Sequence, residues 1–178
     1  MTPMSIFSWG FWGWGTTTPQ LIKAVDAAER QRGFDPPIFV DIRFRRAGRA
    51  PGFKGDAFEK LLGWRRYRWM PTLGNASIGT QSAARIACPV AANQLLELAL
   101  DASDRSRRVI FFCACESPES LRSCHRHMVS DLLLRAARRR AFRTGMSQTG
   151  TYHWYGVRPL VCDDIWVSID QFINGGSR

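Results

Sequence analysis

Three of the five cysteines and two of the three histidines fall in one stretch, residues 109–134. It reads VIFFCACESPESLRSCHRHMVSDLLL, where an apolar run ends in Cys-Ala-Cys and Cys-His-Arg opens a segment with helical periodicity. Thiols and imidazoles serve in nucleophilic, redox and metal chemistry. Three interpretations therefore compete: a reactive-thiol site, a metal site, and core packing around an anion-binding helix end.

The segment that begins at Cys124 is the strongest predicted helix, over residues 123–142. Its apolar stripe includes Val129 and Leu133, and His125 lies one turn before Val129 on that stripe. We therefore expect His125 to point toward the sheet. The unpaired N–H groups at a helix start favour an anion, and Arg126 and Arg122 would add guanidinium donors.

The positive field at such a helix start would also favour the thiolate form of Cys113 or Cys124. On this hypothesis one of these cysteines is the reactive thiol and His125 is the general acid or base. The plainer alternatives stay open: free cysteine is commonly a small core residue, and His125 can be a hydrogen-bonded structural histidine.

A metal site would use Cys113, Cys115, Cys124 and His125, which are ligand types that suit zinc. The spacing C-x-C-x8-C-H is not a common closed zinc pattern. Neighbouring side chains on a helix also point about 100° apart, which separates an adjacent Cys-His pair. The sequence therefore predicts no metal and no cofactor.

A second polar pair ends the apolar run IFVDIRF. Asp41 and Arg43 are two residues apart, so in a strand their side chains share a face. Asp41 would either orient Arg43 or His125 toward a bound anion, or simply neutralise Arg43. The loop that follows is strongly basic as far as Lys54.

Strands alternate with helices along the chain, which predicts a single three-layer α/β domain over residues 1–178. Its sheet would be mostly parallel and Rossmann-like, with helices on both faces and ligands at the carboxyl ends of the strands. The expected strands are residues 4–9, 38–44, 65–70, 109–112 and 151–157, and the expected helices are residues 19–32, 56–62, 81–86, 89–102 and 123–142.

The chain has 25 Lys and Arg against 15 Asp and Glu, so its net charge of +10 favours a phosphate-containing ligand or nucleic acid as partner. Five cysteines form no recognisable disulfide framework, and no apolar run approaches the ~18 residues of a membrane span. The N-terminal stretch is a poor signal peptide. These features predict a cytoplasmic protein without membrane association.

Several motifs together resemble the bacterial and archaeal domain-of-unknown-function family numbered 488. They are VDIR followed by PGF, then PTLGN, and finally CACESPE with CHRHMVSDLL. The similarity covers about residues 6–142 and leaves 143–178 as a C-terminal extension. It implies a compact Rossmann-like α/β fold but no reaction, because the family has no settled activity. The site residues that it implies are Asp41, Arg43, Cys113, Cys124, His125 and Arg126.

Our leading hypothesis is an enzyme that uses Cys113 or Cys124, together with His125, on a nucleotide or nucleic-acid-related substrate. One alternative is a non-catalytic nucleic-acid-binding module, in which the basic loop 43–54, the RRYR segment and exposed aromatic residues between Trp9 and Trp14 hold the strand. Another is a partner-binding or structural domain with GFWGWG as an exposed aromatic patch.

Overall fold

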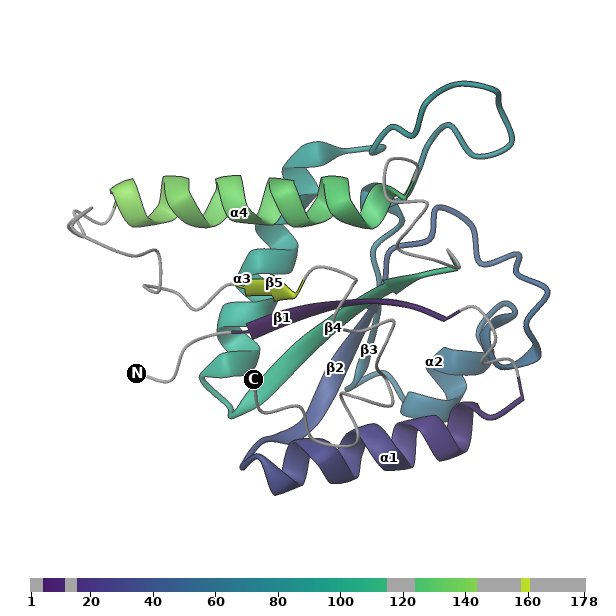
Figure 1. Cartoon of the computed structure of the whole chain (residues 1–178), viewed down its shortest axis with the longest axis vertical. Coiled ribbons are helices and arrows are strands. Elements are labelled where there is room, and N and C mark those ends of the chain that lie inside the picture. The colour runs from purple at the N-terminus through teal and green to yellow at the C-terminus, as the bar shows by residue number, and fades with distance from the viewer. Residues whose placement is uncertain (1–4, 12–15, 115–123, 144–157, 161–178) are drawn as a thin grey trace.

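Five parallel strands form the central sheet, in the order β3-β2-β4-β1-β5 (Figure 1). In a computed structural model of the chain, the described residues are 5–11, 16–114, 124–143 and 158–160. β4 is central and pairs with β1 on one side and β2 on the other. The strands are β1 (Ser5–Gly10), β2 (Asp35–Asp41), β3 (Tyr67–Trp69), β4 (Arg107–Cys113) and β5 (Arg158–Leu160).

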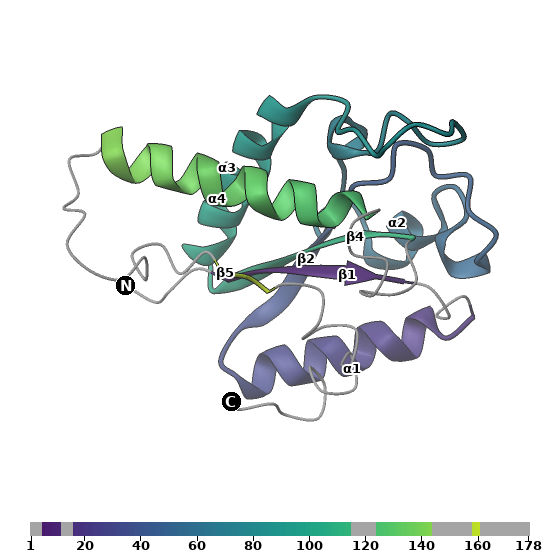
Figure 2. The ribbon, with the colours of Figure 1, turned by 45° about the horizontal axis from the view of Figure 1, so that its top comes forward.

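Helices cover both faces of the sheet, which confirms the predicted three-layer α/β architecture. Helices α3 (Ala92–Ser103) and α4 (His125–Arg143) lie on one face. Helices α1 (Thr18–Gln31) and α2 (Ala57–Leu62) lie on the other, as Figure 2 shows for α1. Within the described ranges, no helix is both long enough and apolar enough to cross a bilayer.

The alternation of side chains along β4 divides the core into two parts. Val109 and Phe111 face α3 and α4 in a largely aliphatic cluster. Ile110 and Phe112 face α1 and α2 in a largely aromatic cluster. Trp9 stands in that aromatic cluster and is 1% exposed, with its ring centroid 5.6 Å from that of Phe112.

The aromatic N-terminal segment is therefore partly core. The expectation that Trp9 is an exposed stacking platform is wrong, because its side chain faces α1 and α2 across the sheet. Phe11, inside the GFWGWG motif, is also buried and stacks on Phe53, with the two ring centroids 3.9 Å apart. Trp12 and Trp14 lie outside the described residues.

The predicted helix at residues 81–86 is wrong as well. The chain there forms a loop, because the side-chain oxygen of Asn75 accepts the backbone N–H groups of Ser77 and Arg85, and Ile86 bridges back to Asn75. These bonds replace the helical ones. The strand predicted at residues 151–157 falls outside the described residues, and β5 lies just after it.

Gly74 lies at a close backbone approach near the carboxyl end of the sheet. A β-carbon at this position would lie 2.4 Å from the backbone nitrogen of Phe44. Phe44 follows directly after the Asp41–Arg43 segment, so the two loops touch where only a hydrogen side chain fits. The PTLGN motif thus has a packing reason for its glycine.

We expect Gly74→Ala to lower the free energy of unfolding by about 1–3 kcal/mol, the usual cost of overpacking a rigid site. Urea denaturation followed by circular dichroism measures it. Gly48→Ala is the control, because its β-carbon would meet one atom, Nη1 of Arg43, at an ordinary 3.4 Å. Equal urea midpoints for Gly74→Ala and Gly48→Ala would contradict the close contact between Gly74 and Phe44.

Candidate functional site

The carboxyl ends of β2 and β4 and the start of α4 meet at one edge of the sheet. Asp41 is in register with Phe112, so the residues that follow β2 lie beside the end of β4. Cys113 ends β4, and Cys124 directly precedes α4. One ligand atom from each of Cys113, Cys124 and His125 lies within 4.8 Å of the others. The predicted convergence of these three side chains is thus present in the structure.

The two sulfurs are buried and close to each other. The Sγ atoms of Cys113 and Cys124 are 3.8 Å apart, and the two residues are 1% and 3% exposed. Arg126, which is fully buried, donates from Nε to the Sγ atom of Cys124 at 3.2 Å. A cationic donor on a sulfur favours the thiolate over the thiol. This contact therefore suits Cys124 to act as a nucleophile or a metal ligand.

His125 points into the molecule, as its position on the apolar stripe predicts. Its Nε2 atom lies 3.3 Å from the backbone oxygen of Ile42. Burial lowers the pKa of His125, while the nearby Cys124 and the bond to Ile42 partly oppose this. Since a carbonyl oxygen can only accept, the neutral ring carries its proton on Nε2 and keeps a lone pair on Nδ1.

Asp41 and Arg43 form a buried pair with several hydrogen bonds. The Nε atom of Arg43 donates to Oδ1 of Asp41 at 2.8 Å and Nη2 donates to Oδ2 at 2.5 Å, while Nη1 donates to the backbone oxygen of Phe53 at 2.7 Å. The guanidinium also lies 5.1 Å from the ring centroid of Phe11. Of the two roles considered for Asp41, the structure favours neutralising Arg43.

Tyr67 is a member of this site that sequence reasoning missed. Its hydroxyl donates to Oδ2 of Asp41 at 2.7 Å. Burial, and then the charge of Asp41, raise the pKa of Tyr67, so the phenol stays protonated and keeps donating. The alternation in RRYRWM places Tyr67 in a strand, but nothing in the sequence links it to a carboxylate 26 residues away.

The structure therefore separates the predicted residues into two groups. Cys113, Cys124, His125 and Arg126 form a thiol–imidazole cluster. Asp41 and Arg43 form a neighbouring ion pair, and in the described part of the chain the side chain of Asp41 bonds to Arg43 and Tyr67 and not to His125. Arg122 and Cys115 lie outside the described residues.

Comparison with family models, curated proteins and solved structures found no match to this chain. The resemblance to family 488 thus stays a prediction, and the function has to be argued from the geometry of the site.

We expect Tyr67→Phe to lower the free energy of unfolding by about 1–3 kcal/mol, because the buried carboxylate of Asp41 loses a donor. Chemical denaturation measures the change. Thr80→Val is the matched control, since it removes an exposed hydroxyl that donates to the Ser77 backbone oxygen and accepts from the Ser82 backbone N–H. Its effect should stay within about 0.5 kcal/mol. If Tyr67→Phe leaves the free energy of unfolding unchanged, the hydrogen bonds from Arg43 are sufficient to stabilise the buried carboxylate of Asp41.

Proposed function

We propose that the cluster of Cys113, Cys124, His125 and Arg126 is the active site of an enzyme acting on a phosphate-containing ligand, a nucleotide or nucleic-acid-related compound. The observation that carries this proposal is the guanidinium of Arg126 on the sulfur of Cys124, beside a neutral imidazole and a second thiol. Membership of family 488 is part of the same proposal.

Each group has a role that its contacts allow. Cys124 is the reactive thiolate, since Arg126 favours its charged form. His125 is the general base, because its bond to Ile42 orients the ring and leaves Nδ1 to accept a proton. Cys113 is the second thiol, with its Sγ atom 3.8 Å from that of Cys124. The anion would be held by Arg126 and the first turn of α4.

The ligand class follows from charge and position. Ligands of open parallel sheets bind outside the carboxyl ends of the strands, which is where this cluster lies. The net charge of +10 favours an anionic ligand in general. The buried Asp41–Arg43 pair next to the cluster is electrically balanced, so Arg126 and the helix start are the groups we assign to the anion.

Alkylation rates test whether Cys124 is a reactive thiolate next to a site that attracts anions. We expect Cys124 to prefer anionic iodoacetate over neutral iodoacetamide by about threefold to tenfold relative to Cys88, because Arg126 and the helix start attract an anion. Mass spectrometry of the intact folded protein, then of its peptides, gives each rate.

Arg126→Gln should abolish that preference, and inorganic pyrophosphate should slow the reaction in the parent protein only. Cys88 is the internal control, as a free, partly exposed cysteine that is not a member of the cluster. If Cys124 reacts only after unfolding, the proposed thiol chemistry is excluded.

The same atoms favour a second candidate, a zinc site. Two sulfurs bound tetrahedrally at about 2.3 Å from zinc lie about 3.8 Å apart, and those of Cys113 and Cys124 are 3.8 Å apart. A zinc-binding histidine usually donates its other N–H to a carbonyl or carboxylate, as Nε2 of His125 does to Ile42. Full burial of both sulfurs also suits a ligand better than a nucleophile, since reactive cysteines are partly exposed.

The objection that an adjacent Cys-His pair points apart does not hold here. Cys124 precedes the first helical residue of α4, so the two side chains are not spaced by helical geometry. The three protein ligands found among the described residues would leave a fourth zinc position for water or a substrate oxygen. Zinc would then supply Lewis-acid chemistry at the same edge.

If the cluster binds zinc, we expect the protein purified without chelators to contain about one zinc per chain by elemental analysis. Cys113→Ser and Cys124→Ser should reduce zinc to about a tenth of that, whereas Cys88→Ser should keep the parent content. Circular dichroism shows whether each variant is folded. Absence of zinc from the parent, together with no uptake of added Zn²⁺, would leave thiol chemistry as the function of the cluster.

A further inference from the structure

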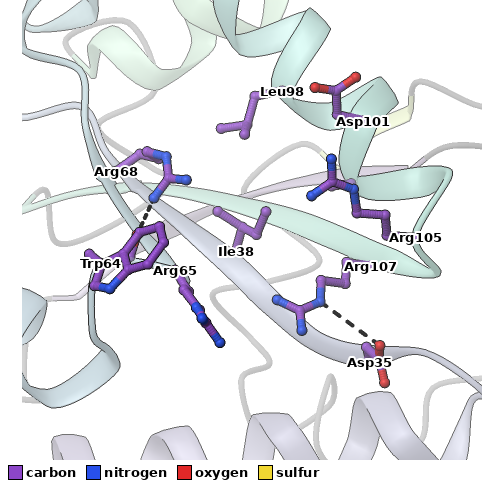
Figure 3. A pocket seen from close by; sticks show the side chains of 10 residues that line it. Asp35, Ile38, Trp64, Arg65, Arg68, Leu98, Asp101, Arg105 and Arg107 are labelled. Carbon is purple, nitrogen blue, oxygen red and sulfur yellow. Dashed lines mark hydrogen bonds and ion pairs between the residues drawn. The ribbon is translucent and has the colours of Figure 1, made fainter.

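A cleft of about 620 Å³ lies at the edge of the sheet opposite the thiol–imidazole cluster, where the strands begin (Figure 3). We call it the rear cleft. The apolar side chain of Ile38, from β2, lies between the Arg68 and Arg107 side chains, with Leu98 of α3 above. The ten lining residues are Asp35, Ile38, Trp64, Arg65, Arg68, Leu98, Asp101, Ala102, Arg105 and Arg107.

The rear cleft is positively charged. Four arginines and two aspartates line it, which leaves a net charge of +2. Arg107 approaches Asp35 only to 3.9 Å. Among the described residues, Arg65 and Arg105 have no carboxylate partner, and both are exposed. These guanidinium groups are open to an anion from solvent.

The indole of Trp64 also lines the rear cleft. Trp64 is 70% exposed, the most exposed large hydrophobic side chain of the described residues. The guanidinium of Arg65 lies 5.3 Å from the centroid of its ring. Open aromatic rings among arginines are how proteins hold single-stranded nucleic acid, since bases stack on the rings and phosphates bind the cations.

We propose that the rear cleft binds a single strand of nucleic acid, with a base stacked on Trp64 and adjacent phosphates on the arginines. Its volume suits one nucleotide unit, within the range of about 300–1,000 Å³ for small-molecule sites. The proposal goes beyond the thiol or zinc site, which uses other residues at the other edge. It shares Arg65 and Arg68 with the RRYR segment of the sequence-based alternative. It does not use loop 43–54, where Arg43 is buried and Arg46 pairs with Glu59.

Fluorescence anisotropy of the full chain with a labelled twelve-nucleotide oligothymidylate tests the rear cleft. The double variant Arg65→Ala/Arg105→Ala should weaken binding about tenfold to a hundredfold. Its slope of log K against log salt should be shallower by about 1.4, the value for two phosphate contacts of a single strand. Trp64→Ala should weaken binding about fivefold to a hundredfold, and Trp64→Phe should keep most of it.

The control is Arg45→Ala/Arg49→Ala, which removes the same charge from two exposed arginines of the loop after β2. It should change affinity less than threefold. An equal loss in the control would mean that the strand responds to net charge alone, which overturns the assignment to the rear cleft. No binding by the parent chain, or full displacement of the strand by equimolar ATP, would also overturn it.

Discussion

The buried carboxylate of Asp41 constrains the whole carboxyl edge of the sheet. It is fully buried, and an unpaired charge there would cost several kcal/mol, so the fold must bring partners to it. Those partners are Arg43, two residues after the end of β2, and Tyr67 from β3, and Arg43 in turn donates to the Phe53 backbone oxygen. Ile42 lies between the paired residues, and its carbonyl oxygen orients His125. The position of the His125 imidazole therefore depends on the Asp41 carboxylate, to which it makes no hydrogen bond.

Arginine has two different roles at the two ends of the strands. At the carboxyl edge, Arg43 and Arg126 are buried, where they neutralise a carboxylate and polarise a sulfur. At the amino edge, Arg65 and Arg105 are exposed beside an open indole. Net charge alone cannot distinguish these roles, because it counts a guanidinium inside an ion pair as it counts one in water. The basic character of this chain is thus part of its core as well as of its surface.

Much of the fold and of the cluster can be predicted from the sequence. Continuous apolar runs predict β2 and β4, and the stripe through Val129 correctly places His125 against the sheet. What the sequence misses depends on tertiary contacts: the loop that replaces a helix at 81–86 is held by Asn75, and Trp9 is buried by residues distant in the chain. The bond from Tyr67 to Asp41 likewise exists only once two strands pair.

The central place of β4 also affects how the chain can be made. Both β1 and β2 bond to β4, and they do not bond to each other. During synthesis, β1 therefore leaves the ribosome long before its partner β4, whereas β2 has β3 as an earlier partner on its other edge. Until Cys113 has emerged, β1 and β2 cannot be joined into one sheet, and the apolar strand β1 is exposed in the way that makes nascent chains depend on chaperones.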